Sequence, residues 1–262
     1  MTPHNPALYT ATNLQVGYAA EPVIDGIDLT LAEGRITALI GPNGCGKSTL
    51  LKALGRQLAP TGGRICLGGR DIREYSRRSF AREVAFLAQE PVTPEGVSVR
   101  DVISYGRYPY TGRFATMSSA DHAAVEAAAD SAGVGQLLDT PATDLSGGQR
   151  QRVWVAMALA QQTPVLLLDE PTTYLDPAHQ VAILDLVSGL KATGRTVVMV
   201  LHDMTQAARF ADDVVAMRDG RIVAAGPTEE VLTPELVRDV FGIECLSVTD
   251  PDTGRRLPVP YR

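Results

Sequence analysis

The sequence contains few cysteines, no excess of basic residues and no apolar run long enough to cross a membrane. The three cysteines, Cys45, Cys66 and Cys245, are odd in number and widely spaced, so they do not form the pattern of a disulfide framework or a zinc site. We therefore expect a reducing compartment. The formal net charge of −6 argues against a nucleic-acid groove as the main surface, although it is compatible with a local basic patch.

We expect neither a signal peptide nor a membrane-spanning segment within this sequence. Residues 1–10 have no basic stretch followed by an apolar one, and the most apolar runs, Val165–Leu168 and 197–201, are far shorter than the roughly 20 residues that span a bilayer. We expect a soluble, cytoplasmic protein, so any membrane role must come through a partner. The length of 262 residues permits one large domain or two small ones, with a core that needs no metal or disulfide.

The most informative stretch matches the pattern Gly-x-x-x-x-Gly-Lys-Ser of a phosphate-binding loop. It comprises Gly41, Pro42, Asn43, Gly44, Cys45, Gly46, Lys47, Ser48 and Thr49. A buried strand is predicted over 35–40 and a helix over 48–58. Glycine lets the loop curl so that backbone N–H groups point at phosphate oxygens, and the helix N-terminus adds its dipole. Lys47 can reach the β- and γ-phosphates, and the Ser48 hydroxyl can ligate Mg²⁺. The alternative interpretation of the motif is a Gly/Pro turn that matches the pattern by chance.

Two further candidates end predicted strands. Tyr18 ends the strand 13–18, which forms a predicted antiparallel pair with 23–31. Its ring is either an ordinary strand aromatic or a platform that stacks on a nucleobase, and the local sequence favours neither. Gln89 ends a buried strand over 84–89. It is either a plain strand-end residue or a hinge residue whose amide reaches Mg²⁺ or the attacking water.

Two helix starts are marked by capping residues. The first follows Leu145, Ser146, Gly147, Gly148 and Gln149 and opens a helix predicted over 150–161. A Ser-Gly-Gly run there offers free N–H groups and the helix dipole to an anion, and the alternative is a flexible turn that only caps the helix. Asp176 followed by Pro177 predicts the second start, of a helix that runs to Ala192.

Acidic residues and a histidine follow two buried strands. Asp169 and Glu170 come directly after Val165–Leu168, whose four apolar residues indicate a central parallel strand. Asp169 can hold Mg²⁺ and Glu170 can lie beside the nucleophilic water, while a solvated acid pair is the alternative. His202 follows a strand over 196–201. A strand-end histidine is more often structural, but ligands of open α/β sheets lie at the carboxyl ends of the strands, where His202 is predicted.

The remaining patterns complete a predicted α/β chain without internal repeats. The region from about 97 to 152 is predicted to be an inserted helical subdomain, because its periodicity is helical. Its helices are expected over 99–105 and 119–132, and a short helix is expected over 233–241. Hairpins are expected over 213–225, around Asp219 and Gly220, and over 245–259.

Taken together, the motifs resemble the nucleotide-binding subunit of ATP-binding cassette (ABC) transporters. The resemblance covers nearly the whole chain in the right order, and the Leu-Ser-Gly-Gly-Gln run at 145–149 separates this family from other phosphate-loop NTPases. It implies a single ABC ATPase domain, with a RecA-like, mostly parallel sheet core and an N-terminal antiparallel β subdomain over about 1–90 and 156–262. The helical signature subdomain would then occupy about 91–155.

The resemblance also implies a role for each motif residue. Tyr18 would stack on adenine, residues 41–49 would wrap the phosphates of ATP, Lys47 among them, and His202 would contact the γ-phosphate. Ser48 and Gln89 would meet Mg²⁺ with support from Asp169, and Glu170 would polarise the water. Two cassettes of this family pair head to tail. In such a homodimer Ser146, Gly147, Gly148 and Gln149 would face ATP bound to the other copy, and Asp176 would lie at the dimer seam.

One run departs from the commonest cassette pattern. Where many relatives have Ser or Asn and then Ala before Leu-Asp, this chain has Pro171-Thr172-Thr173-Tyr174-Leu175-Asp176. Together with residues 87–89 and 104–109, this run resembles the sequence of the ATPase of iron(III)–siderophore importers. Importers of haem and vitamin B12 are close relatives of that family. The expected partners are two transmembrane permease subunits at the cytoplasmic face of the cell membrane and, indirectly, a substrate-binding protein.

The runner-up from a different class is a non-transport cassette ATPase that acts on ribosomes or DNA. Such relatives usually carry two cassettes in one chain or a long coiled coil, and this sequence has neither feature. Its acidic net charge also disfavours nucleic acid as a partner.

Overall fold

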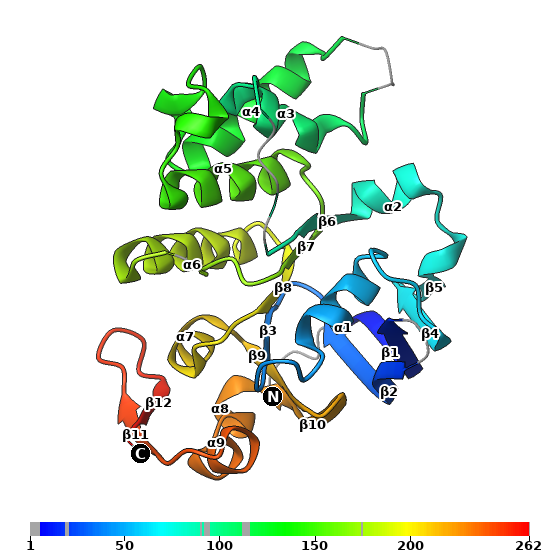
Figure 1. Ribbon diagram of the computed structural model, residues 1–262, viewed down its shortest axis with the longest axis vertical. Coiled ribbons are helices and arrows are strands. Elements are labelled where there is room, and N and C mark those ends of the chain that lie inside the picture. Colours follow the sequence, from blue (N-terminus) through cyan, green and yellow to red (C-terminus); the bar gives the residue numbers. More distant parts are fainter. Residues whose placement is uncertain are drawn as a thin grey trace. The chain divides into compact units, whose positions relative to one another are not determined.

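The computed structural model describes residues 6–18, 21–89, 91, 95–111, 116–173 and 175–261. The chain divides into two compact units (Figure 1). The first unit combines Met1–Glu74 with Thr196–Arg262, and the second comprises Tyr75–Arg195. The second unit is therefore an insertion in the sequence of the first.

The first unit begins with an antiparallel sheet in the strand order β2-β1-β4-β5. The strands are β1 (Ala7–Tyr18), β2 (Glu21–Ala32), β4 (Gly62–Leu67) and β5 (Arg70–Asp71). Tyr9 and Ala11 of β1 are buried before an irregularity at Asn13, where φ is 45°, and Leu14 and Val16 are buried after it. The irregularity shifts the buried positions by one residue, as a bulge does. The predicted antiparallel pair of strands is confirmed.

A second set of strands in the same unit has the order β10-β9-β3-β8. The strands are β3 (Ile36–Ile40), β8 (Thr196–Val200), β9 (Asp213–Arg218) and β10 (Arg221–Pro227). β3 is parallel to both β8 and β9, and every residue of β3 and β8 is buried. The helix α1 (Lys47–Leu54) contacts β8, and α7 (Met204–Phe210) contacts β3. Continuous burial of this kind is typical of parallel strands that are covered by helices.

The C-terminal part of the first unit adds two short helices and a hairpin. They are α8 (Thr228–Val231), α9 (Pro234–Phe241), β11 (Cys245–Thr249) and β12 (Arg256–Pro260). β12 contacts α7, and the Thr205 hydroxyl donates to the Pro258 carbonyl oxygen at 3.1 Å. The predicted helix over 233–241 and both predicted hairpins are confirmed, and the first hairpin turns through Asp219 and Gly220 with φ of 50° and 74°.

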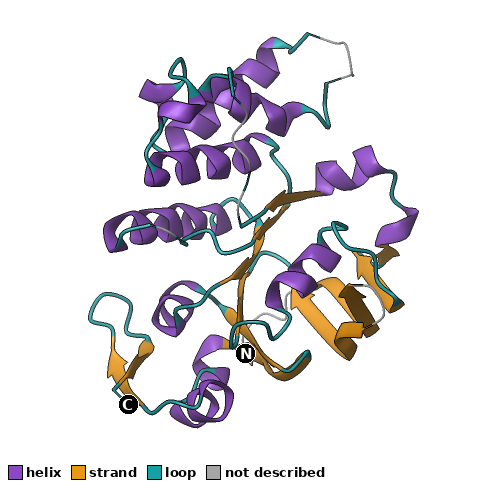
Figure 2. Ribbon diagram, viewed as in Figure 1, coloured by secondary structure: helices purple, strands orange, loops and turns teal. Residues whose placement is uncertain are grey.

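The second unit is mainly helical, as Figure 2 shows. Its two strands, β6 (Val84–Leu87) and β7 (Val165–Leu168), are parallel neighbours. Its helices are α2 (Arg77–Glu83), α3 (Val99–Ser104), α4 (Ser119–Ser131), α5 (Gly147–Ala160) and α6 (Pro177–Lys191). α5 packs against α3 and α4. Ser98, Ser118 and Ser146 each begin a helix with a capping box, so these helix starts follow directly from the local sequence.

The α/β fold class is confirmed, while some element boundaries differ from those predicted. α1 ends at Leu54 rather than at residue 58, because Gly55 caps it and Arg56 adopts a φ of 55°. α5 begins at Gly147 rather than at residue 150, since the Ser-Gly-Gly run is part of the helix start. α2 and α7 were not predicted, because seven residues are too few to establish a helical period. The finer domain boundaries near 91 and 155 remain a prediction.

Candidate active site

The phosphate-binding loop joins β3 to α1 in the first unit. Three of its glycines adopt positive φ: 147° at Gly41, 77° at Gly44 and 105° at Gly46. Gly46 is the N-cap of α1 in the left-handed conformation. A Cβ at Gly41 would collide with the carbonyl oxygen of Met217 on β9. The glycines therefore have two roles in this loop. They adopt the positive φ that its curl requires, and Gly41 also lets the backbone of the loop pass close to β9.

Lys47 lies inside the curl of this loop. Its side chain is buried, and its ammonium group donates to the carbonyl oxygens of Gly41 at 2.8 Å and Pro42 at 2.9 Å. Cys45 is also buried, and this burial raises the pKa of its thiol despite the nearby Lys47. A single cation thus lies within a ring of backbone groups at the start of a helix, an arrangement suited to phosphate.

The loop shares one edge of the parallel strands with His202. Because β3 and β8 are parallel with Leu39 opposite Val200, the segments that follow them emerge at the same edge. The N–H of Leu201 donates to the Leu39 carbonyl oxygen at 3.1 Å, which extends this pairing to the residue before His202. His202 is exposed there, and its place after a buried parallel strand is the one predicted from the sequence.

Tyr18 and Ser48 are further candidate residues of the first unit. Tyr18 is the last residue of β1, and 54% of its surface is exposed, so its ring is accessible to a ligand. Ser48 is half-buried in the first turn of α1, and Thr49 beside it is buried. Asn43 and Gly44 are the exposed residues of the loop.

The second unit brings together Gln89, Asp169 and Glu170. They follow β6 and β7, which are parallel with Leu87 opposite Leu168, and the N–H of Asp169 donates to the Leu87 carbonyl oxygen at 2.9 Å. The amide nitrogen of Gln89 donates to Glu170 Oε2 at 2.6 Å. Asp169 and Glu170 are both buried. Gln89 and Glu170, which are 81 positions apart in the sequence, therefore lie together in one acidic site, where the Gln89 amide is bonded to the Glu170 carboxylate.

The Glu170 carboxylate is held in an unusual backbone conformation. Its φ is 53°, which is uncommon for a residue that has a Cβ. Besides the Gln89 amide, the Thr173 hydroxyl donates to Glu170 Oε2 at 3.0 Å. A strained backbone whose carboxylate is fixed by two donors is a common feature of catalytic sites. Thr173 is not among the site residues predicted from the sequence, although its position three residues after the acid, in a turn, was the available signal.

The Leu-Ser-Gly-Gly-Gln run opens α5 with a reciprocal cap. The N–H of Gln149 donates to the Ser146 hydroxyl at 3.3 Å, and the N–H of Ser146 donates to Gln149 Oε1 at 3.0 Å. This cap uses the side chain of Gln149 within its own helix. Gly147 and Gly148 lie in the first turn, where backbone N–H groups have no partner inside the helix.

Asp176 caps α6 in a similar way. Its carboxylate accepts from the N–H of His179 at 3.0 Å, and its second oxygen lies 2.7 Å from His179 Nδ1. The backbone hydrogen bond from His179, followed by the bond from its ring, lowers the pKa of Asp176. The predicted N-cap is confirmed, whereas its imidazole partner was missed, although their i, i+3 spacing at a helix start was a readable signal.

The donor set of this chain suits Mg²⁺. The candidates Ser48, Gln89 and Asp169 offer a hydroxyl, an amide and a carboxylate oxygen, which are the hard ligands that Mg²⁺ prefers. The Gln89 amide nitrogen is bonded to Glu170, which leaves the amide oxygen for a cation. Within the described part of the chain, no three His, Cys, Asp or Glu side chains cluster as a metal site of their own.

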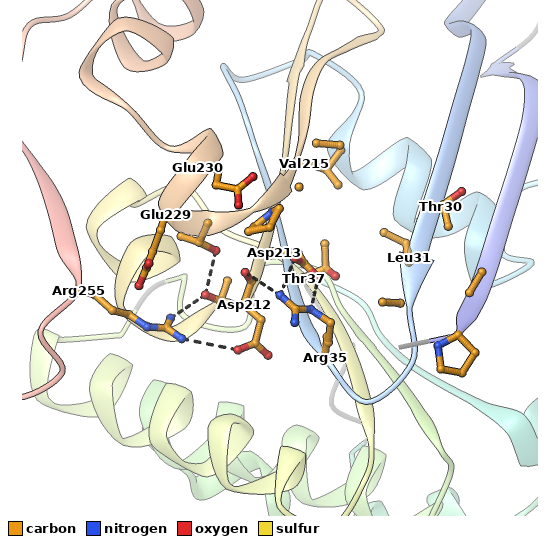
Figure 3. Close-up of a pocket in the computed structure, with 18 residues that line it drawn as sticks. Thr30, Leu31, Arg35, Thr37, Asp212, Asp213, Val215, Glu229, Glu230 and Arg255 are labelled. Carbon is orange, nitrogen blue, oxygen red and sulfur yellow. Dashed lines mark hydrogen bonds and ion pairs between the residues drawn. The ribbon is translucent and has the colours of Figure 1, made fainter. Parts of the chain in front are cut away.

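A separate cavity of about 880 Å³ in the first unit contains none of the predicted site residues (Figure 3). Arg35 donates to both oxygens of Asp213 at 2.5 and 2.7 Å. Arg255 donates to the carbonyl oxygen of Ala211 at 2.7 Å and lies 3.6 Å from Asp212. Both arginines are already paired with carboxylates or carbonyl oxygens of the protein. The glycine loop is therefore a better candidate for the phosphate site than this cavity.

A glycine loop with a buried lysine at the start of a helix, and an acid pair that follows a parallel strand, are the features of a phosphate-loop ATPase. Residues 24–173 match the family described as ABC transporter, and the chain belongs to this family. It binds ATP and hydrolyses it, as the family does. Among solved structures, cbiO1 from Clostridium perfringens, part of the ABC transporter complex cbiONQ, has a TM-score of 0.76 and 29% identity, and covers 89% of this chain and 93% of its own.

Two curated relatives are similar over almost their whole lengths. The achromobactin transport ATP-binding protein CbrD of Dickeya dadantii is 46% identical and covers 96% of this chain and 94% of its own. The ferric enterobactin transport ATP-binding protein FepC of Escherichia coli is 43% identical and covers 94% of this chain and 92% of its own. In the described ranges, no helix is both long and apolar enough to cross a membrane.

Proposed function

We propose that this chain is the energy-coupling ATPase of an importer for iron(III)–siderophore complexes. The observation that carries the proposal is the identity of 46% and 43%, over nearly full length, to ATP-binding proteins of achromobactin and ferric enterobactin transport. At residues 171–176 the chain departs from the commonest cassette sequence pattern, and this departure supports the same assignment. The cargo never touches this subunit, so the proposal concerns the partner system that the chain drives.

The proposed hydrolysis uses the two groups of residues described above. ATP would be held by the loop 41–49 with Lys47 at its phosphates, and by Tyr18 at its base. Mg²⁺ would be held by Ser48, Gln89 and Asp169. Glu170, fixed by Gln89 and Thr173, would polarise the attacking water, because its carboxylate is buried and can accept a proton. His202 would contact the γ-phosphate.

The proposed working form is a homodimer. The Ser146–Gly148 turn and Asp176 would then face the ATP bound by the second copy, and Gln149 would support this turn through its cap. Gly147 has open space around it, since a Cβ there would meet nothing within 4 Å, and the free N–H groups of this helix start suit a γ-phosphate. ATP would hold the two copies together until hydrolysis removes it.

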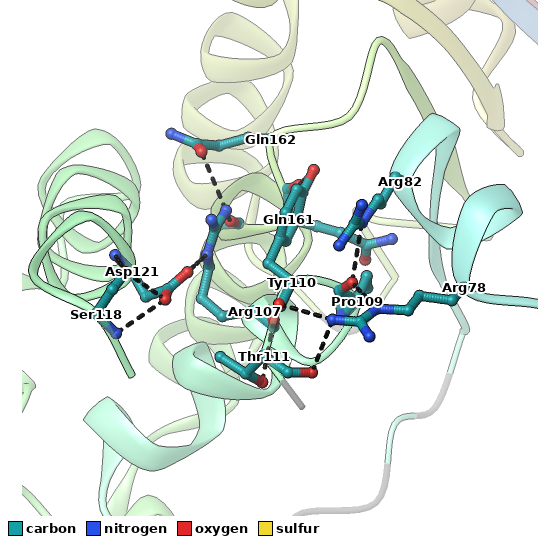
Figure 4. A network of polar contacts seen from close by, with 11 residues as sticks. Arg78, Arg82, Arg107, Pro109, Tyr110, Thr111, Ser118, Asp121, Gln161 and Gln162 are labelled. Atoms are coloured by element: carbon teal, nitrogen blue, oxygen red, sulfur yellow. Dashed lines mark hydrogen bonds and ion pairs between the residues drawn. The ribbon is translucent and has the colours of Figure 1, made fainter. Parts of the chain in front are cut away.

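The proposed contact with two permease subunits involves the second unit, at the cytoplasmic face of the membrane. Tyr108 of this unit is 65% exposed. It lies on the turn 105–111, which overlaps the run 104–109 whose sequence resembles that of the importer ATPases. Arg107 holds this turn from inside: it is buried and donates to Asp121 at 2.9 Å and to the Ala160 carbonyl oxygen at 2.7 Å (Figure 4). Arg78 braces the same turn by donating to the Pro109 carbonyl oxygen at 2.8 Å.

The proposal is tested by uptake of radiolabelled iron in cells that lack the chain, supplied with a ferric hydroxamate, a ferric catecholate, haemin or cobalamin in turn. We expect uptake of a ferric siderophore to need the wild-type chain. Selective loss of haemin or cobalamin uptake would contradict the cargo assignment. Capture of ribosomes instead of membrane subunits from the same cells would contradict a transport role altogether.

The Glu170→Gln variant tests the hydrolytic assignment. It keeps the shape of the side chain and a carbonyl oxygen for Gln89, but it cannot accept a proton. We expect ATP binding to be retained while the turnover rate falls by about 10²–10³, the effect of losing one preorganised group. Turnover at the wild-type rate would show that another residue acts as the base.

A further inference from the structure

The segment that follows Glu170 is fixed by side-chain amides from two helices. Gln151 of α5 donates to the Pro171 carbonyl oxygen at 3.0 Å. Gln180 of α6 donates to the carbonyl oxygens of Thr172 at 3.3 Å and Leu175 at 3.0 Å. These bonds hold main-chain atoms, so the backbone at Pro171, Thr172 and Leu175 is held by both helices.

His179 joins this segment to the signature turn. Its Nδ1 lies 2.7 Å from Asp176 Oδ2, and because a carboxylate can only accept, Nδ1 carries the proton in this contact. The same ring lies beside Gly148: a Cβ built on this glycine would be 3.5–3.7 Å from Cγ, Cδ2 and Nδ1 of the imidazole, which is ordinary van der Waals distance. The ring thus lies beside the glycine of the signature turn, at the place that a Cβ of residue 148 would touch, while it is paired with the carboxylate of Asp176.

We propose that His179 is a positioning residue for ATP hydrolysis, which keeps the signature turn and Asp176 in one fixed relation. The inference rests on the proposed homodimer, in which both groups reach the second copy. Two groups that must engage a partner together do so at a lower entropic cost when they are held in place beforehand. His179 would supply this preorganisation and touch neither ATP nor Mg²⁺.

An ordinary capping role is the alternative, and the structure separates the two. The bond from the backbone N–H of His179 to Asp176 caps α6 whatever the side chain at 179 is. Substitutions of the side chain therefore preserve the cap. His179→Phe retains a ring against Gly148 but no hydrogen bond, His179→Asn retains a nitrogen near the Nδ1 position but no full ring, and His179→Ala removes both.

The experiment uses the full chain and measures nucleotide affinity, kcat, KM and urea stability for these three variants. His122→Ala is the matched control, since His122 is an exposed histidine on α4 of the same unit. ATP-dependent dimerisation of each variant is followed by size-exclusion chromatography in the Glu170→Gln background, where ATP persists.

We expect His179→Ala to lower kcat by about threefold to fivefold, the range for an exposed polar pair, and to weaken dimerisation, with nucleotide affinity and stability unchanged. The Phe and Asn variants should both be impaired, since each retains one contact only. Wild-type kcat in the Ala variant, full activity in either single-contact variant, or a loss explained by reduced stability would overturn the inference. If the Glu170→Gln chain stays monomeric with ATP, the proposed homodimer itself fails, and this inference fails with it.

Discussion

Replacement of Gly41 by alanine tests the geometry of the phosphate-binding loop without any nucleotide. Gly41 has a φ of 147°, and its added Cβ would meet the carbonyl oxygen of Met217 and, at 2.8 Å, the sulfur of Cys45. The carbonyl belongs to β9, which is paired on both sides, so it cannot move away cheaply. Gly44 is the matched control, because its φ is also positive, at 77°, yet a Cβ there has nothing within 4 Å.

The expected magnitudes follow from these two environments. A side chain forced into a glycine-only conformation costs about 1–3 kcal/mol, and overpacking against a fixed neighbour adds about 1–3 kcal/mol. The lower entropy of the unfolded alanine chain offsets about 0.4–1 kcal/mol of this cost, so Gly41→Ala should lower the free energy of unfolding by about 3 kcal/mol. Gly44→Ala carries only the left-handed strain of about 1–2 kcal/mol, partly offset by the lower entropy of its unfolded chain, which leaves about 1 kcal/mol.

Urea unfolding followed by circular dichroism measures both values in nucleotide-free protein. If the free energy of unfolding falls with urea concentration at the same slope in both variants, the variants expose the same surface on unfolding. The difference between their unfolding midpoints then reports the difference in stability. Destabilisation of the same size in the two variants would refute the reasoning, because the contacts with Met217 and Cys45 and the more extreme φ are found at Gly41 alone of these two positions.

Two further predictions concern the Arg107 network. Arg107→Ala should lower the free energy of unfolding by about 3–5 kcal/mol, the effect of breaking a buried ion pair, while Arg100→Ala, whose ion pairs are exposed, should cost less than about 1 kcal/mol in the same urea assay. The Ser118 hydroxyl, more than any other group, lowers the pKa of Asp121 to about 2. The stability from this ionised carboxyl is complete above its unfolded pKa of about 4 and is lost as the pH falls towards 2, so Asp121→Asn should flatten the acid limb of the stability–pH curve.

Much of the site was predictable because its residues act through local backbone chemistry. The three loop glycines adopt the positive φ that the motif requires, and Ser146 and Asp176 cap their helices as their positions predict. The strand-end positions of Gln89, Asp169 and His202 were also readable, since the apolar runs before them become buried parallel strands. Local rules of this kind need no knowledge of distant contacts.

The contacts that support these residues were not predictable, because they join segments far apart in the chain. The bond from Gln151 to the Pro171 carbonyl spans 20 positions, and the bond between Gln89 and Glu170 spans 81. Arg107 gives no sequence signal that distinguishes it from an exposed arginine, yet it is buried among Asp121 and carbonyl groups. Burial of a charge depends on which elements pack around it, which periodicity does not encode.

The backbone of Glu170 shows why the missed contacts belong to the function. A positive φ at a residue with a Cβ costs free energy, so the conformation persists only where neighbours hold it. Here Gln89 and Thr173 hold the carboxylate, and Gln151 holds the residue that follows. These neighbours come from the segment after β6, from the acid's own turn and from the signature helix. The position of the proposed base is thus determined by the same elements that are proposed to bind Mg²⁺ and the second copy, which connects hydrolysis to assembly within one unit.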